Sequence, residues 1–143
     1  MFDMKLETAK RGFFDRERVK RSVDAATRRV LSKFGAFVRQ RAKTSIRKRK
    51  GISPPMHPPY SHVGLLRQFI FFAYDEERKS VVIGPTLLRS GSEVPRLLEY
   101  GGETTIKKHG KALLARYRPR PYMRPAFEEE ESNLTALWRN SVR

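Results

Sequence analysis

The chain has no cysteine, which excludes disulfide bonds, thiolate metal sites and cysteine nucleophiles. It also lacks an apolar run near the roughly 20 residues that a membrane-spanning helix needs. The first residues mix acidic and apolar side chains without the continuous apolar segment of a secretory signal. We therefore expect a chain of 143 residues that folds as one domain, with neither a membrane span nor a signal peptide.

Acidic residues are scarce, and their scarcity is uneven. Residues 1–50 carry 17 lysines and arginines against 5 acidic residues, whereas residues 51–143 carry 14 against 10. Three interpretations of the basic half stay open: a solvated helix face, a contact with an acidic protein, and a contact with the phosphates of a nucleic acid.

The N-terminal half is dominated by one predicted helix, over residues 15–47, preceded by a tail of residues 1–14. Asp15 is the expected N-cap. The apolar residues expected to face the core recur at helical spacing: Val19, Val23, Ala26, Val30, Phe34 and Phe37. Such a helix is about 48 Å long, which exceeds the needs of a small domain, so we expect part of it to project or to pack on a neighbouring subunit.

Residues 48–63 read as a basic, proline-rich arm, because four prolines in six residues, from Pro54 to Pro59, exclude a helix and favour an extended chain. This arm has little apolar content to offset the entropy cost of ordering. We therefore predict that Ile52 to His62 is poorly ordered in the free subunit and becomes ordered on assembly.

The remaining residues, 64–143, predict a sheet and two helices. Residues 65–74 are expected to form a strand with both faces covered, paired with residues 80–83 across a polar turn. A short helix follows over residues 93–100 and stops at Gly101-Gly102. Residues 104–106 and 113–117 suggest a second hairpin around His109-Gly110, although residues 111–116 are also compatible with a helix.

The last helix is expected from Arg124 or Pro125 to Ser141, because proline suits the first helical turn. Four residues at helical spacing are expected to face the core: Phe127, Leu134, Trp138 and Val142. The predicted fold class is α+β, with a long N-terminal amphipathic helix, a small antiparallel sheet of about four strands, a short middle helix and a C-terminal helix packed on the sheet.

The sequence offers no catalytic or metal-binding constellation, so we expect no enzymatic activity, no metal and no cofactor. His57 and His62 lie in the proline-rich arm without a nearby acid. In the acidic run from Glu128 to Glu131, consecutive helical residues point in different directions, and the run suits the positive end of a helix. Glu99 is predicted to form an ion pair or a subunit contact.

Four short motifs follow one another along the chain. The first is Gly64-Leu65-Leu66-Arg67, the second is Gly84-Pro85, the third is Glu99-Tyr100-Gly101, and the last is Arg120-Pro121-Tyr122-Met123-Arg124-Pro125-Ala126. In kind and order these motifs resemble the tail-completion, or head–tail joining (neck), proteins of long-tailed bacteriophages and prophages. The resemblance covers roughly the C-terminal two thirds of the chain.

The resemblance implies a virion structural protein that completes the head-proximal end of the tail and joins it to the neck or head. It implies assembly in the bacterial cytoplasm as a ring, expected to be a hexamer, around the passage for double-stranded DNA. The implied partners are further copies of the chain, neck or head-closure proteins, and tail-terminator or tail-tube proteins.

Two alternatives come from other classes of protein. Composition favours a basic nucleic-acid-binding protein that acts alone, in which aromatic side chains stack on bases. A nuclease or toxin would need a metal-binding set of acids and histidines, which the sequence lacks.

Two groups of residues are predicted to make contacts with partners. The rigid proline-flanked motif and the residue before Gly101 predict an oligomer or partner interface at Tyr100, Arg120, Tyr122, Met123 and Arg124. We also expect Tyr100, Tyr122 and Met123 to pack together. The basic helix and the run after it predict contact with an anionic surface at Arg28, Arg29, Arg39, Arg41, Arg47, Lys48, Arg49 and Lys50.

Overall fold

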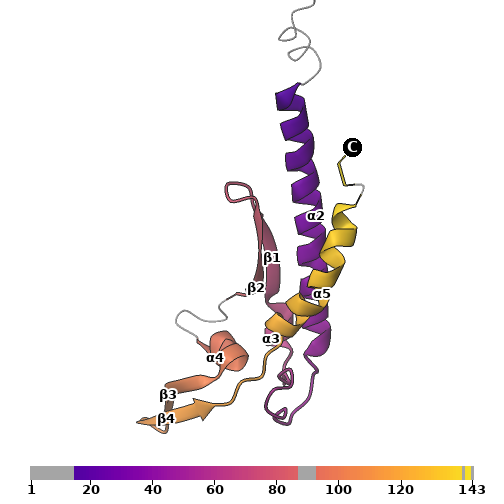
Figure 1. Cartoon of the computed structure of the whole chain (residues 1–143). Coiled ribbons are helices and arrows are strands. Elements are labelled where there is room, and N and C mark those ends of the chain that lie inside the picture. The colour runs from indigo at the N-terminus through magenta and orange to yellow at the C-terminus, as the bar shows by residue number, and fades with distance from the viewer. Residues whose placement is uncertain (1–14, 87–92, 140, 143) are drawn as a thin grey trace, which may run out of the picture.

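The computed structural model describes residues 15–86, 93–139 and 141–142, so the tail predicted for residues 1–14 lies outside the described residues. Its elements in chain order are α2 (Arg16–Ser45), α3 (Leu65–Gln68), β1 (Ile70–Asp75), β2 (Ser80–Pro85), α4 (Val94–Tyr100), β3 (Gly102–Lys108), β4 (Lys111–Tyr117) and α5 (Met123–Trp138) (Figure 1). The α+β class is as predicted.

The long helix α2 matches its prediction in extent but not in its buried face. Asp15 caps it, since its carboxylate accepts a hydrogen bond from the backbone N–H of Arg18 at 3.0 Å. The buried stripe runs through Ala26, Val30, Phe34, Val38 and Ala42.

Three predicted members of this stripe, Val19, Val23 and Phe37, are exposed. The rest of the fold covers only the later turns of the helix, and there the buried position is Val38 rather than Phe37. The first turns of α2 project beyond the other elements (Figure 1).

The predicted strand over residues 65–74 is wrong in its first half. Leu65–Gln68 forms the single helical turn α3, and the strand β1 begins only at Ile70. The chain enters this turn at Gly64 with a φ of 84°, a left-handed conformation that glycine adopts without steric cost. The strand is also covered on one face rather than two, since Ile70 is buried while Phe71 is exposed.

The strands form two separate sheets, not the single sheet of about four strands that the sequence predicted. β1 pairs with β2, and β3 pairs with β4, each as an antiparallel hairpin. Residues 111–117 are therefore a strand, not the alternative helix. No strand of one hairpin pairs with a strand of the other among the described residues.

The β1–β2 hairpin packs against α2 at Gly35. A Cβ atom built on Gly35 would lie 2.8 Å from the Val81 side chain and 3.0 Å from Phe72. The absence of a side chain at Gly35 therefore lets the hairpin approach the helix closely, which offsets the roughly 1 kcal/mol that glycine costs inside a helix.

The last helix, α5, packs mainly against α2, not on a sheet as predicted. The rings of Phe34 and Phe127 meet edge to face, with centroids 5.5 Å apart. The buried residues of α5 are Ala126 and Glu130.

The prediction of which α5 residues face the core is mostly wrong. Phe127, Trp138 and Val142 are exposed. Of the predicted four, Leu134 is partly buried against the core, and Phe127 stays exposed while its ring meets the core residue Phe34. The helix is rotated from the predicted orientation because its neighbour is the α2 stripe and not a sheet.

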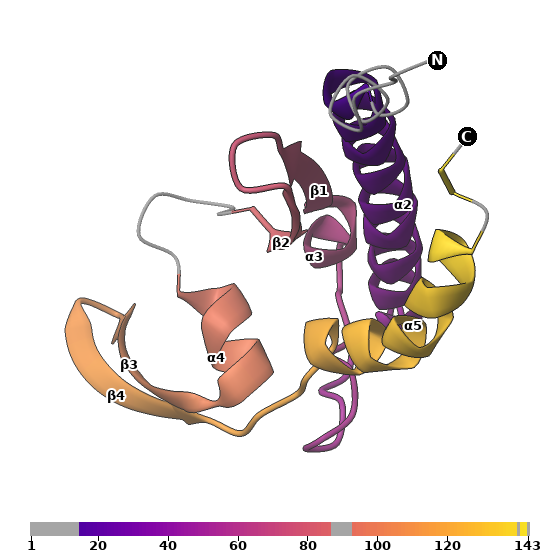
Figure 2. The ribbon, with the colours of Figure 1, turned by 45° about the horizontal axis from the view of Figure 1, so that its top comes forward.

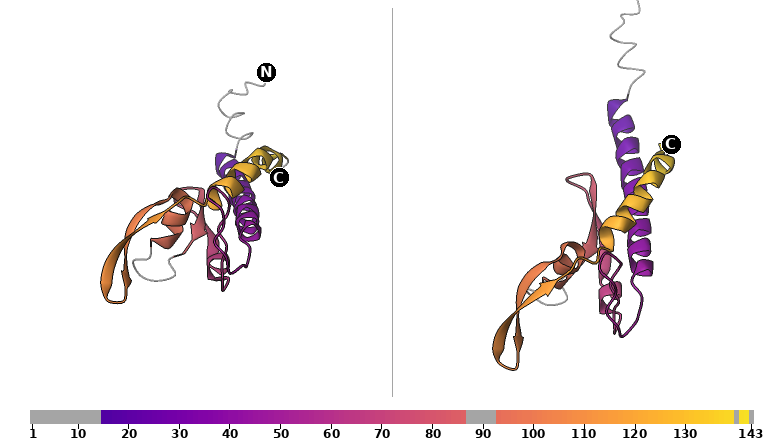
Figure 3. Two further views of the ribbon diagram at one scale, coloured as in Figure 1. Left: turned by 90° about the horizontal axis from the view of Figure 1, so that it is seen from below. Right: turned by 60° about the horizontal axis from the view of Figure 1, so that its bottom comes forward.

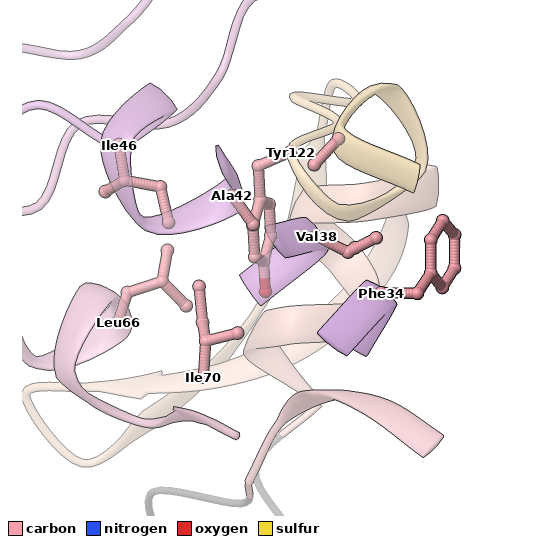
Figure 4. Packing of buried hydrophobic residues seen from close by; sticks show 8 residues of the cluster. Phe34, Val38, Ala42, Ile46, Leu66, Ile70 and Tyr122 are labelled. Atoms are coloured by element: carbon pink, nitrogen blue, oxygen red, sulfur yellow. The ribbon is translucent and has the colours of Figure 1, made fainter. Parts of the chain in front are cut away.

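One core joins α2, α3, β1 and α5. Its buried members are Phe34, Val38, Ala42, Ile46, Leu66, Ile70, Tyr122 and Ala126 (Figure 4). Figure 4 shows the Tyr122 ring lying between the α2 residues and Ile70. The core therefore closes only when the chain preceding α5 returns to the C-terminal half of α2.

The second hairpin lies outside this core. α4 and the β3–β4 hairpin form an arm to one side of the α2–α5 pair, and the hairpin curves around α4 (Figures 2 and 3). The molecule is thus elongated, with a helical body at one side and a two-stranded arm at the other.

Candidate functional site

The motif residues Glu99 and Tyr122 to Arg124, distant in sequence, meet where the helical body joins the arm formed by α4 and the β3–β4 hairpin. The Glu99 carboxylate accepts three hydrogen bonds from backbone N–H groups at the start of α5: those of Tyr122 at 3.0 Å, Met123 at 3.1 Å and Arg124 at 2.8 Å. These N–H groups have no partner within their own helix, and their end of the helix favours negative charge. Glu99 therefore caps α5 from α4, and among the described residues it forms no salt bridge of the kind that was one of its two predicted contacts.

In the Glu99-Tyr100-Gly101 motif, the last position has to be glycine for a steric reason. Gly101 has a φ of 72°, and its backbone N–H donates to the Leu97 carbonyl at 2.9 Å, which ends α4. A Cβ atom at this position would lie 2.9 Å from the Pro119 ring and 3.0 Å from the Tyr117 carbonyl oxygen. The chain leaving β4 can therefore run close beside α4 only because residue 101 is glycine.

The predicted interface residues Tyr100, Tyr122 and Met123 fall into different environments. Tyr122 is buried and anchors α5, and Met123 packs against the core, so both serve the fold. Tyr100 is 72% exposed and does not join them, which corrects the prediction that the three pack together. They share only the lining of an apolar cleft of about 430 Å³, which also includes Ile83 and Pro95.

The other two predicted interface residues, Arg120 and Arg124, have intramolecular partners. Arg124 donates to Glu128 at 2.8 Å, and this hydrogen bond raises the pKa of its guanidinium above the ordinary value. Arg120 donates to the backbone carbonyls of Ser53 at 2.8 Å and Arg118 at 3.2 Å. Arg120 thereby ties the proline-rich arm to the end of β4.

The Tyr122 hydroxyl is buried and finds no hydrogen-bond partner among the described residues. Burial raises the pKa of Tyr122 well above its ordinary value, and the nearby charge of Glu99 adds to this effect. The side chain therefore stays neutral in the fold and acts as a packing group with an unsatisfied hydroxyl.

The four α2 arginines predicted to meet an anionic surface all make contacts within the chain. Arg28 pairs with Glu76 at 2.6 Å, and Arg29 donates to the Ser141 carbonyl at 2.7 Å. Arg39 donates to the Ile70 carbonyl at 2.7 Å. These contacts fasten the first hairpin and the C-terminal end to the long helix.

Arg41, the fourth, makes the most buried of these pairs. Its guanidinium donates to Glu130 and to Glu129, both at 2.6 Å. The hydrogen bond from Arg41 lowers the pKa of Glu130 against the opposing effect of burial, and a bond from Asn133 lowers it further. Glu130 is only 7% exposed, so the pair brings a charge into the α2–α5 interface.

The run from Arg47 to Lys50 is different, because all four of its side chains are exposed and none forms a salt bridge among the described residues. The Arg49 guanidinium lies over the Tyr60 ring, 5.3 Å from its centroid. The backbone of Arg47 bridges to Tyr60, and the Ser61 N–H donates to the Arg47 carbonyl at 2.9 Å. Of the basic residues singled out in the sequence, these four are the most available to a partner.

The proline-rich arm is held to the rest of the chain in this structure. The Met56 N–H donates to the Pro119 carbonyl at 2.9 Å, and Ser53 and Ser61 are buried. The proline-rich arm and the end of β4 line a cleft of about 480 Å³. Tyr60 belongs to the first wall, and Arg116, Tyr117 and Arg118 belong to the second.

Sequence reasoning missed this cleft, since its two walls are more than 50 residues apart in the chain. Only the alternation of arginine with tyrosine or proline from Arg116 to Tyr122 pointed towards it. In the structure, the first part of this pattern, from Arg116 to Arg120, forms one wall of the cleft.

No group of three or more potential metal ligands lies together within the described part of the chain. His109 occupies the turn between β3 and β4, in a different part of the fold from His57 and His62. Among the described helices, none is both long and apolar enough to cross a membrane.

Comparison of the chain with protein-family models, curated proteins and solved structures gave no match. The family resemblance therefore rests on the four sequence motifs.

Proposed function

We propose that this chain is a structural protein of a phage virion that completes the head-proximal end of the tail and joins it to the neck or head. It assembles as a ring, a hexamer by the family resemblance, around the passage for DNA. Its neighbours are neck or head-closure proteins on one side and tail-terminator or tail-tube proteins on the other. It is made and assembled in the bacterial cytoplasm and ends in the virion.

The observation that carries this proposal is the amount of apolar surface that the single chain leaves exposed on both hairpins. Phe71 and Val82 are 47% and 63% exposed on the outer face of the β1–β2 hairpin. Ile106 and Leu113 are opposite each other in the β3–β4 register, and both are exposed. An isolated two-stranded hairpin is only marginally stable in water, and exposed apolar patches of this kind mark protein interfaces.

The exposed face of the β3–β4 hairpin and the exposed Val19 and Val23 at the start of α2 are separate surfaces, and their separation supports a closed ring over a simple pair. The β3–β4 arm and the projecting start of α2 lie at opposite parts of an elongated molecule (Figure 3). Two different surfaces on one subunit allow a head-to-tail contact, and such contacts generate rings when the rotation closes. The joint formed by Glu99, Gly101 and the Arg-Pro motif fixes the direction of the β3–β4 arm relative to the helical body.

Deletion of the gene from the phage or prophage that encodes it tests the proposal. Electron micrographs of the lysate should show DNA-filled heads and separate tails, and expression of the wild-type chain in trans should restore joined virions. An Arg78→Gln chain, changed at an exposed residue in the turn of the first hairpin, should complement equally well and serves as the matched control. Normal tailed virions without the gene would contradict the proposal and favour the stand-alone nucleic-acid-binding protein.

A further inference from the structure

We infer that the cleft between the proline-rich arm and β4 binds phosphate groups of a nucleic acid backbone. This inference narrows the DNA contact included in the proposed function to one site, and to that extent it rests on that function. It also moves the contact from the four predicted arginines of α2, which are engaged within the chain, to the arginines at the end of β4 and the basic run after α2.

The composition of the cleft points to an anion. Its lining contains three arginines, Arg116, Arg118 and Arg120, and no aspartate or glutamate. Arg120 is occupied by backbone carbonyls, whereas Arg118 forms no salt bridge within the described residues and Arg116 has only Glu103, at 3.9 Å. Arginine presents several donors in a planar fork that matches phosphate geometry.

The exposed run Arg47 to Lys50 adds positive charge at the rim. Tyr60, which lines the cleft, bridges through its backbone to Arg47 and carries the Arg49 guanidinium over its ring. Through Tyr60, the basic run therefore lies next to the cleft that the two arginines line. Cations gathered this way repel one another, and an extended polyanion satisfies several of them at once while releasing its counterions.

The aromatic part of the lining favours a nucleic acid over a simple inorganic ion. Tyr60 and Tyr117 are both in the lining, and tyrosine rings offer stacking surfaces for bases and hydroxyl donors for phosphates.

Binding of a fluorescein-labelled 20-base-pair duplex to the whole protein, measured by anisotropy over a range of salt concentrations, tests the inference. The variant R116Q/R118Q should bind more weakly. Its slope of log K against log salt should be smaller by about two, because each arginine that no longer neutralises a phosphate removes about 0.9 from the slope. The variant R78Q/R96Q removes the same net charge from exposed side chains elsewhere, and its slope should stay that of the wild type.

Equal reductions of affinity in the two variants would overturn the cleft assignment while leaving the joining role, which the gene deletion tests separately, intact. A labelled single strand of the same length should bind at least as well as the duplex, because the tyrosines stack on unpaired bases. Markedly weaker binding of the single strand would overturn the stacking role of Tyr60 and Tyr117.

Two competitors separate the phosphate backbone from other anions. Inorganic phosphate should compete only as much as its ionic strength predicts. If polyglutamate binds as tightly as DNA and its affinity falls equally in R116Q/R118Q, the cleft recognises acidic protein and the phosphate assignment is wrong.

Discussion

At the scale of single residues, Glu99 and Tyr122 show how one side chain can connect two parts of the fold. Glu99 stands at the end of α4 and supplies the cap that α5 lacks in its own N-terminal residues, where Tyr122 has no side-chain cap hydrogen bond. N-cap interactions are worth about 0.5–2 kcal/mol. Tyr122 then fills the core with its ring, so the motif that suggested a partner interface is first a folding joint.

The buried hydroxyl of Tyr122 leads to a prediction about stability. Because the hydroxyl has no partner among the described residues, Tyr122→Phe should leave the free energy of unfolding unchanged or raise it by about 1–3 kcal/mol. Tyr122→Ala should instead lower it by about 3–5 kcal/mol through the cavity left behind. Urea unfolding at pH 7 measures both. A clear loss of stability in the phenylalanine variant would contradict the absence of a hydrogen bond.

Tyr122 also leads to a prediction about how the stability of the fold changes at high pH. The pKa of Tyr122 is raised in the folded state, so the folded chain keeps the neutral form. The stability that depends on this neutral form is fully present below the unfolded pKa of about 10 and is lost as pH rises towards the higher folded pKa. Tyr122→Phe should reduce this alkaline loss in unfolding curves measured from pH 9 to 11. An identical alkaline loss in the two proteins would assign it to other groups.

At the scale of elements, the packing of α2 explains where the sequence pattern succeeded and where it failed. Its length and its Asp15 cap follow from local signals, which act within a few residues. Its buried face depends on what lies against it. The hairpin at Gly35 and the helix α5 cover only the later turns, so Val19 and Val23 satisfy the helical period without being buried.

The charged pair within the α2–α5 interface leads to a prediction about two arginines. Arg41→Gln should destabilise the fold more than Arg28→Gln, because Arg41 holds the nearly buried Glu130 whereas Arg28 pairs with an exposed Glu76. Exposed pairs contribute only about 0–1 kcal/mol. Denaturant midpoints of the two variants provide the comparison, with the exposed pair as the matched control. Equal shifts would show that the Arg41 pair is no more important than a surface pair.

At acidic pH, the free energies of unfolding of the wild type and of Arg41→Gln should become more similar. The pKa of Glu130 is lowered in the fold chiefly by the hydrogen bond from Arg41. Its contribution is therefore present above the ordinary glutamate pKa of about 4.3 and is lost as pH falls. Unfolding curves from pH 7 to 3 should show the two proteins converging, and a constant gap would indicate that Arg41 acts through packing alone.

At the scale of the whole molecule, the fold leaves the part of its second hairpin around Ile106 and Leu113 uncovered. Thr104, Ile106, Leu113 and Ala115 share one face by the strand register. Thr104 and Ala115 are half-buried on this face, near Gly102 and its contact with Leu97, whereas Ile106 and Leu113 are exposed. The elongated shape in Figure 2 places this hairpin where a neighbouring subunit can reach it. The proposed ring would provide the layer that the single chain lacks.

Substitutions on this hairpin test that role. The double variant Ile106→Thr/Leu113→Thr keeps β-forming residues and should change the stability of the monomer by less than about 0.5 kcal/mol. It should weaken self-association in sedimentation velocity, because it removes the apolar face proposed for the neighbour. Leu114→Thr, on the opposite face and also exposed, is the control. If the control weakens assembly as much, the face has been wrongly assigned.

The sequence by itself determined the features whose signals are local: the Asp15 cap, the stop at Gly101, the proline in the first turn of α5 and the turn between β1 and β2. It left residues 111–116 open between strand and helix. It determined the net charge and the absence of thiols as well. The tertiary structure decided that the hairpins stay separate, that α5 rests on α2, and which cations are engaged. These outcomes depend on contacts between residues far apart in sequence, such as Arg41 with Glu130 and Glu99 with Arg124, and no periodicity or local propensity encodes which distant partner a side chain meets.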